Sequence, residues 1–116
     1  MFYGSAFILK GYIMKITAVI VAGGKGTRMG ADKNKVFLKI LGREVLYYTI
    51  SAFEKNDKID DIIVVTGKND IEECQILVDK YDIKKVSYIT EGGATRQESV
   101  INGLKKAEGD VVLIHD

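Results

Sequence analysis

The chain has 116 residues, 47% of them hydrophobic and 28% charged, with 17 basic and 16 acidic residues and a net charge of +1. This composition fits one globular domain, and the balanced charge leaves no broad cationic surface for a polymeric nucleic acid. One cysteine, Cys74, excludes a disulfide framework and a multi-cysteine metal site within the chain, so we expect a cytoplasmic protein.

The first segment, residues 1–14, is apolar but is interrupted by Lys10 and Gly11. It lacks the basic start and small-residue end of a signal peptide, and a membrane span needs about 20 apolar residues. We therefore expect no membrane partner. We interpret residues 1–14 as an N-terminal extension to a domain over 15–116, with Met14 as a candidate translation start.

Four short apolar runs predict strands that are buried on both faces of a parallel sheet. They are Ile16–Ala22, Ile62–Thr66, Val86–Thr90 and Val111–Ile114. Strands that alternate with helices predict an α/β, Rossmann-like open parallel sheet with helices on both faces. Ligands of such sheets bind at the carboxyl ends of the strands, so the loops after the first, third and fourth strands are the place to look.

Three amphipathic segments between these runs predict the helices. The first covers 44–55, and its spacing places one set of apolar residues on the buried face: Val45, Tyr48, Ala52 and Phe53. The second begins at a cap-like Asn69 and buries Ile71, Cys74, Leu77, Val78 and Tyr81. The third begins with a capping box from Thr95 to Glu98 and buries Val100, Leu104 and Ala107.

A glycine-rich loop, residues 22–30, follows the first strand. Glycines let backbone N–H groups approach an anion, and Lys25 and Arg28 add positive charge, so the loop suits phosphate. It is not a dinucleotide fingerprint, because Met29 replaces the last glycine, and it is not a Walker A loop, because Gly26 follows Lys25 directly. A simple tight turn is the alternative.

The order Ala-Gly-Gly-x-Gly-x-Arg-Met, with Lys35 seven residues after Arg28 and Phe37 two further on, resembles the signature loop of nucleotidyltransferases that act on sugar or polyol phosphates. The resemblance implies that Arg28 and Lys35 stabilise charge on the α-phosphate and on the departing pyrophosphate. The alternative is that both are solvated surface cations. It also implies that the loop wraps the triphosphate through Ala22, Gly23, Gly24 and Gly26.

This chain departs from the signature beside Lys35. Those enzymes usually carry proline before this lysine and glutamine after it, where this chain has Asn34 and Val36.

A second signature, residues 91–100, resembles the Gly-Gly-x-x-Arg-Gln-x-Ser-Val segment of the 2-C-methyl-D-erythritol 4-phosphate cytidylyltransferase family. The resemblance implies that backbone groups of Gly93 and Ala94 and the hydroxyl of Ser99 read the edge of cytosine, while Arg96 braces the loop. A glycine turn leading into a capped helix is the alternative, but it does not account for Arg96 or Gln97.

The final residues, His115 and Asp116, match the His-Asp pair of the same family. The resemblance implies that Asp116 helps to hold Mg²⁺, a cation that prefers carboxylate and phosphate oxygens, and that His115 is a packing residue. The implied reaction transfers CMP from CTP to 2-C-methyl-D-erythritol 4-phosphate and releases pyrophosphate. No nucleophilic side chain is needed, so we assign Cys74 to the core.

The resemblance covers residues 15–116 but only about half of a family member, so we interpret the chain as truncated. The other half normally supplies the polyol phosphate pocket, the rest of the metal site and the arm that forms a homodimer. Three alternatives stay open: a ribitol 5-phosphate cytidylyltransferase, a sugar nucleotidyltransferase that uses another base, and an inactive nucleotide-binding fragment.

Overall fold

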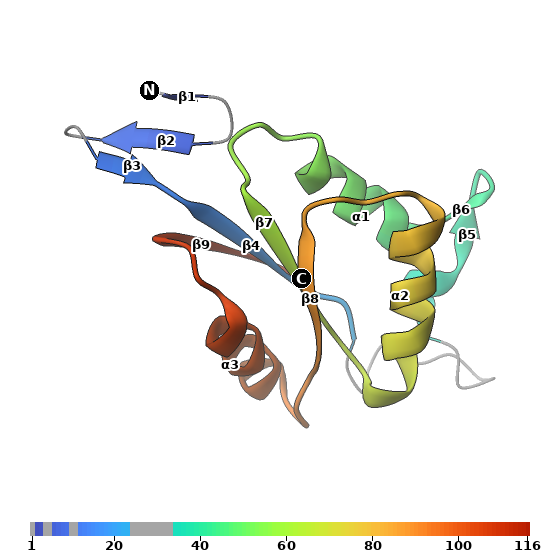
Figure 1. Ribbon diagram of the computed structural model, residues 1–116. Coiled ribbons are helices and arrows are strands. Elements are labelled where there is room, and N and C mark those ends of the chain that lie inside the picture. The colour runs from blue at the N-terminus through green and yellow to red at the C-terminus, as the bar shows by residue number, and fades with distance from the viewer. Residues whose placement is uncertain (1, 4–5, 10–11, 24–33) are drawn as a thin grey trace.

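A computed structural model describes residues 2–3, 6–9, 12–23 and 34–116 (Figure 1). Its centre is a four-stranded parallel sheet in the order β8-β7-β4-β9. The strands are β4 (Ile16–Val21), β7 (Asp61–Thr66), β8 (Val86–Glu91) and β9 (Val111–His115). The predicted open parallel sheet is therefore confirmed, and each predicted strand agrees with the observed one to within one residue at either end.

The first strand of the sheet in the chain, β4, lies between two partners. Ile20 of β4 is opposite Val64 of β7 on one side and His115 of β9 on the other. The chain moves outward from β4 to β7 and β8, and then returns to β9 on the far side of β4. This reversal makes the gap between the carboxyl ends of β4 and β9 a topological switch point, where α/β sheets bind ligands.

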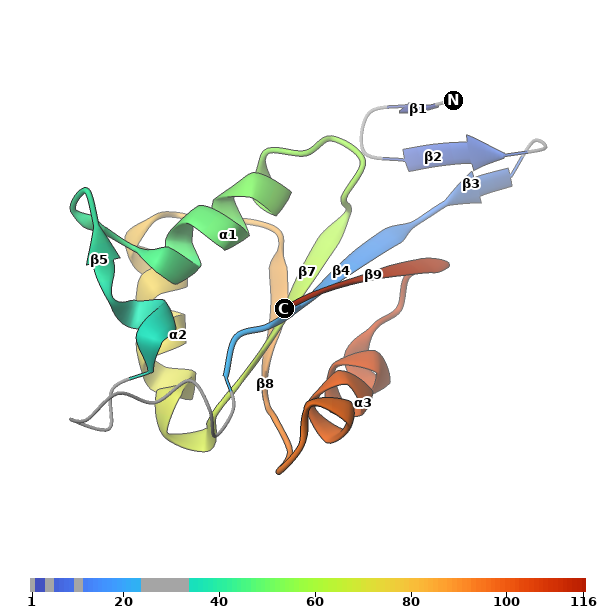
Figure 2. The same cartoon turned by 180° about the vertical axis from the view of Figure 1, so that it is seen from behind.

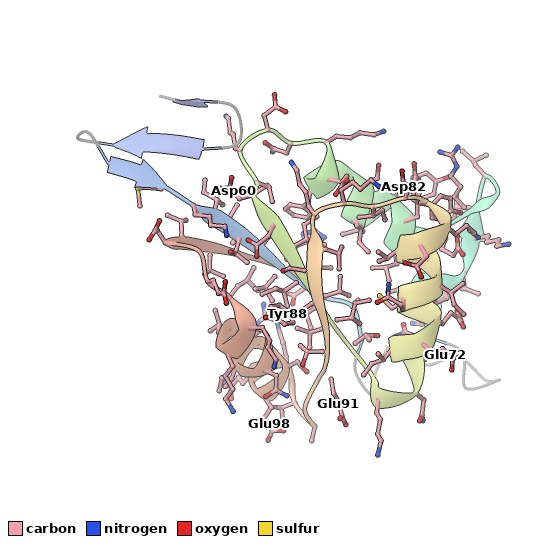
Figure 3. The ribbon with its side chains drawn as sticks, viewed as in Figure 1. Asp60, Glu72, Asp82, Tyr88, Glu91 and Glu98 are labelled. Carbon is pink, nitrogen blue, oxygen red and sulfur yellow. The ribbon has the colours of Figure 1, made fainter. Side chains whose placement is uncertain are left out.

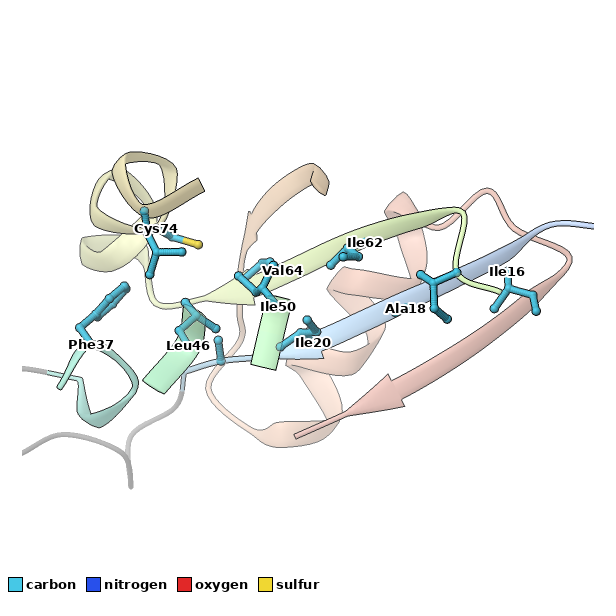
Figure 4. Close-up of a cluster of buried hydrophobic side chains, with 12 residues drawn as sticks. Ile16, Ala18, Ile20, Phe37, Leu46, Ile50, Ile62, Val64 and Cys74 are labelled. Carbon is cyan, nitrogen blue, oxygen red and sulfur yellow. The ribbon is translucent and has the colours of Figure 1, made fainter. Parts of the chain in front are cut away.

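Helices cover both faces of the sheet, as predicted (Figures 1 and 2). Helices α1 (Val45–Glu54) and α2 (Ile71–Lys80) pack on one face, and α3 (Arg96–Lys106) packs on the other. Successive residues of a strand point to opposite faces, so β4 and β7 contribute to two separate cores. The larger core, between the sheet and helices α1 and α2 (Figure 4), includes Ala18, Ile20, Ile62, Val64, Leu46, Ile50, Cys74 and Leu77.

The smaller core, under α3, is centred on Val19, Ile63 and Val65, all with no exposed surface. Gly103 lets α3 approach it closely. A Cβ atom at Gly103 would lie 2.6 Å from Cγ1 of Val19 and 2.9 Å from Cγ2 of Val65, closer than carbon atoms pack. The buried face of α3 is formed by Ser99 and Gly103, whereas Leu104, which we predicted to be buried, is 41% exposed. Hydrophobicity patterns assign glycine no face, and this explains the error.

The predicted buried face of α1 is also wrong in part. Leu46 and Ile50 are its buried apolar residues, whereas Tyr48 is 40% exposed and Ala52 is exposed. Apolar residues surround most of this helix, so their spacing does not select one face. The Tyr48 hydroxyl instead donates a hydrogen bond to the carbonyl of Ile40, at 2.6 Å.

The predicted cap of α2 is one residue out of place. Asn69 lies within a 3₁₀ turn, η3 (Lys68–Asp70), and Asp70 occupies the N-cap position without a side-chain capping bond. The capping interaction of α3 is confirmed, because the Thr95 hydroxyl accepts a hydrogen bond from the Glu98 N–H at 3.1 Å.

Several smaller elements were not predicted from the hydrophobicity pattern of the sequence. Three short strands near the N-terminus form an antiparallel sheet: β1 (Phe2–Tyr3), β2 (Ala6–Leu9) and β3 (Tyr12–Met14). A 3₁₀ turn, η2, and a hairpin precede α1: η2 (Lys35–Phe37), β5 (Lys39–Ile40) and β6 (Arg43–Glu44). Within the described ranges, no helix has the length and apolar character needed to cross a membrane.

Candidate functional site

The carboxyl edge of the sheet collects most of the predicted site residues that the structure describes. Ala22 and Gly23 follow β4, Gly93 and Ala94 follow β8 after one residue, and Asp116 follows β9. Gly24, Gly26 and Arg28 belong to residues 24–33 and lie outside the described part of the chain.

The base of the glycine-rich loop is held against β7. The Ala22 N–H donates a hydrogen bond to the carbonyl of Val65 at 2.7 Å, which continues the pairing of β4 with β7. A Cβ atom at Gly23 would lie 2.9 Å from the backbone nitrogen of Gly67, so the close approach of these two backbones requires glycine at position 23. The glycines and cations of this loop predict a phosphate site, and Ala22 and Gly23, its first two residues, lie at the switch point.

Lys35 lies beyond the loop and is exposed at the start of η2. Its neighbour Asn34 has 1% of its surface exposed and joins the two ends of the loop. The Asn34 amide nitrogen donates to the carbonyl of Ala22 at 3.0 Å, and its amide oxygen accepts from the Val36 N–H at 3.1 Å. From the sequence, Asn34 is only a departure from the usual proline. Asparagine is nevertheless a preferred residue at the start of a helical turn, and this preference is the signal that could have predicted its capping role.

The turn between β8 and α3 is held by its own side chains, and Figure 3 shows Glu91 and Glu98 beside it. The hydroxyl of Ser99, which is 2% exposed, accepts a hydrogen bond from the Gly93 N–H at 3.1 Å. A carboxylate oxygen of Glu98 accepts from the Ala94 N–H at 2.7 Å. Both backbone N–H groups are therefore engaged within the turn. Carbonyl oxygens and the hydroxyl of Ser99, which can donate as well as accept, are the groups that the turn can present to a ligand.

Arg96 connects the start of α3 to the end of β9. Its guanidinium donates to both carboxylate oxygens of Asp116, from Nε at 2.8 and 3.0 Å and from Nη2 at 2.8 Å. These hydrogen bonds lower the pKa of the Asp116 carboxyl below its ordinary value. Both side chains are more than half exposed, so the pair orients the carboxylate more than it stabilises the fold. His115 packs edge-on against the ring of Phe53, with ring centroids 5.5 Å apart.

Asp116 is the only predicted metal ligand in the chain. Across the described residues, no group of three or more His, Cys, Asp or Glu side chains gathers to hold a metal ion. A single carboxylate is consistent with Mg²⁺, which usually binds through one or two carboxylates together with substrate phosphates and water.

A parallel sheet with this strand order, covered by helices on both faces, places the chain in the class of open α/β domains, which bind their ligands at the switch point where the glycine-rich segment begins. Comparison with protein families narrows the class further. The model of the 2-C-methyl-D-erythritol 4-phosphate cytidylyltransferase family matches residues 16–116, and the chain belongs to this family.

Relatives and solved structures agree with this assignment. The 2-C-methyl-D-erythritol 4-phosphate cytidylyltransferase of Clostridium botulinum strain Langeland is 50% identical over 104 residues, which are 88% of this chain and 45% of the relative. The enzyme of the same name from Clostridium tetani is 45% identical over 105 residues, 90% of this chain and 43% of the relative. The chain thus spans a little under half the length of these relatives.

Among solved structures, the 4-diphosphocytidyl-2C-methyl-D-erythritol synthase of Anaerococcus prevotii superimposes with a TM-score of 0.72 at 33% identity, covering 89% of this chain and 43% of that one. The inositol-1-phosphate CTP transferase of T. maritima shares the fold, with a TM-score of 0.67 at 18% identity over 84% of this chain and 41% of that one. The resemblance to the erythritol phosphate family is confirmed, and the ribitol phosphate alternative is not favoured.

Proposed function

We propose that this chain forms the CTP-binding part of an enzyme that transfers CMP from CTP to 2-C-methyl-D-erythritol 4-phosphate and releases pyrophosphate. The observation that carries the proposal is the convergence of two separate signatures of one family on one edge of the sheet. The loop after β4 and the turn after β8 are about 70 residues apart in the chain, yet both open at the carboxyl ends of the strands, where α/β sheets bind nucleotides.

The two signatures divide the nucleotide between them. Backbone groups of the glycine-rich loop, from Ala22 through Gly26, would hold the triphosphate, with Arg28 and Lys35 opposing its negative charge. The turn at Gly93 and Ala94, with the hydroxyl of Ser99, would read the cytosine edge. A base edge that is read by fixed dipoles is discriminated strongly, because a wrong base leaves those dipoles unpaired.

Chemistry in this site would depend on position and charge rather than on a covalent intermediate. A phosphate oxygen of the acceptor attacks the α-phosphorus in line and expels pyrophosphate. No side chain of the described site is an activated nucleophile. Cys74 is fully buried on the core face of α2, and burial raises the pKa of its thiol to about 12.

We propose Mg²⁺ as the cofactor, with the Asp116 carboxylate as its protein ligand. When bound, the ion would neutralise charge on the triphosphate. Arg96 holds Asp116 at the end of β9 and fixes where the carboxylate points.

The relatives are more than twice as long as this chain. The erythritol phosphate pocket and the contacts of a homodimer would lie in the additional length of the relatives. The single buried cysteine is compatible with the cytoplasm, the location that we propose.

Calorimetric titration of the chain with CTP, UTP, GTP and ATP, each with Mg²⁺, tests the proposal. We expect selective binding of CTP, weakened by Arg28→Ala. Lys105→Ala is a matched control, because it removes an exposed cation from the end of α3 that leads away from the site. Binding without preference for cytosine would contradict the assignment of the turn after β8. No binding by a folded sample would show that the chain has no working nucleotide site.

A further inference from the structure

We propose that Asn34 is a positioning residue, which sets Lys35 and the base of the glycine-rich loop in the arrangement that binds the triphosphate. The inference rests on the proposed function, because it concerns the same phosphate site. It goes beyond that function because it assigns a positioning role to Asn34, where such enzymes usually carry proline.

Asn34 bridges the two sides of the glycine-rich loop. On one side, its amide nitrogen donates to the carbonyl of Ala22 at 3.0 Å, directly after β4. On the other side, its amide oxygen accepts from the Val36 N–H at 3.1 Å and caps η2, the 3₁₀ turn that carries Lys35. One side chain thus ties the first residue of the loop to the turn that follows the loop.

The surroundings make this bridge rigid. Asn34 is 1% exposed, and its amide nitrogen also lies 3.3 Å from a carboxylate oxygen of Asp70. A Cβ atom at Gly23 would come within 3.2 Å of the same nitrogen, so the amide packs against the first glycine of the loop. Thr66, at the end of β7, is fully buried nearby, and its hydroxyl has no hydrogen-bond partner among the described residues. A buried polar group without a hydrogen-bond partner destabilises the fold. Removing the Asn34 amide would leave the Ala22 carbonyl without this donor, next to a Thr66 hydroxyl that already has no partner among the described residues.

The backbone of Asn34 explains how it can replace proline. Its φ of −67° and ψ of 129° lie in the region that proline favours, because the proline ring fixes φ near about −65°. A proline would fix this conformation through its ring. Asparagine does not restrict φ, but its amide fixes the same turn through hydrogen bonds and adds a link to Ala22 that proline cannot make.

The consequence for Lys35 follows from the two anchors of η2. Asn34 holds the start of this turn to the end of β4, and Phe37, 3% exposed, holds its end in the core. Lys35 lies between these anchors with its side chain exposed. A cation on a fixed backbone loses less entropy on binding phosphate than one on a mobile loop.

The test compares Asn34→Ala with Thr17→Val, which removes a buried hydroxyl that donates to Asp61 at the opposite end of β4. Each variant is titrated with CTP and with CMP in the presence of Mg²⁺, and its unfolding in urea is measured. A structural role alone weakens both nucleotides equally. We expect Asn34→Ala to weaken CTP about tenfold and CMP less, because the lost contacts position Lys35, which opposes the charge of the whole triphosphate, and CMP keeps only the α-phosphate. Thr17→Val should leave the ratio of the two affinities unchanged.

Two further variants separate the possible outcomes. Asn34→Ser keeps an acceptor for the cap of η2 but is too short to reach Ala22, and it should lower the ratio as Asn34→Ala does. In a Lys35→Ala background, Asn34→Ala should weaken CTP less than it does in the unaltered chain, because part of its effect is exerted through Lys35. An unchanged ratio of CTP to CMP affinity in both Asn34 variants would overturn this inference alone. No CTP binding by the unaltered chain would overturn the proposed function, and this inference with it.

Discussion

Replacing Gly103 by alanine tests whether α3 touches the sheet as closely as the structure shows. The added Cβ atom would lie 2.6 Å from Val19 and 2.9 Å from Val65, in a core without exposed surface. Non-bonded carbon atoms pack at about 3.5 to 4.0 Å, so α3 would have to move outward by roughly 1 Å. Ser99 lies on the same helix, one turn earlier, and its hydrogen bond to Gly93 would lengthen with this movement.

Two opposing effects determine how much Gly103→Ala changes the free energy of unfolding. Alanine stabilises a helix interior by about 1 kcal/mol relative to glycine. Overpacking of a tight core costs about 1 to 3 kcal/mol, and short β-branched side chains such as Val19 and Val65 have little freedom to move aside. We therefore expect Gly103→Ala to lower the free energy of unfolding by about 1 kcal/mol, despite the better helix propensity.

Urea unfolding followed by circular dichroism measures this difference. The double variant Gly103→Ala with Val19→Ala removes the closest of these contacts, so its loss should be smaller than the sum of the two single losses. If Gly103→Ala stabilised the chain by the full helix propensity, the close contact between α3 and the sheet would be refuted.

Three other side chains give predictions that need only routine measurements. Burial alone would raise the pKa of Glu44, but hydrogen bonds, above all from the Tyr81 hydroxyl at 2.7 Å, lower it from 4.5 to about 2. Glu44→Gln should therefore lower the free energy of unfolding by about 1 to 2 kcal/mol near neutral pH. This loss should persist down to about pH 4.5 and shrink as the pH falls toward 2. A loss that is independent of pH would contradict the lowered pKa of Glu44. The thiol of Cys74 should resist an aromatic disulfide reagent at pH 8 until urea unfolds the chain, and rapid reaction of the native state would show that it is not buried. Arg96→Ala should raise the pKa of Asp116 in an NMR titration while changing stability by less than about 1 kcal/mol, because the pair is exposed.

The sequence was most informative where local physics and tertiary structure agree. Strands such as Asp61–Thr66 are apolar on both faces, and only the interior of a parallel sheet accommodates that pattern. The cap of α3 could also be read directly, because Thr95 and Glu98 interact across one turn. These features follow from residues close together in the chain.

The features that the sequence did not predict depend on contacts between distant segments. The buried face of α3 includes Gly103, whose importance lies in Val19 and Val65 of the sheet. Asn34 caps a 3₁₀ turn of only three residues and reaches back to Ala22, so no hydrophobic period marks it. The pairing of Arg96 with Asp116 requires α3 to begin at the edge of the sheet where β9 ends, which only the topology determines.

The central claim is that a cytidine nucleotide binds across the carboxyl ends of β4, β8 and β9. Mapping of amide chemical shifts by heteronuclear NMR, during titration with CTP and Mg²⁺, tests it most directly. We expect the largest changes on Gly23, Lys35, Gly93 and Ala94, whereas Asp61, at the opposite end of the sheet, should be nearly unchanged. Changes centred on Asp61 and the amino ends of the strands, or equal changes with GTP, would contradict it.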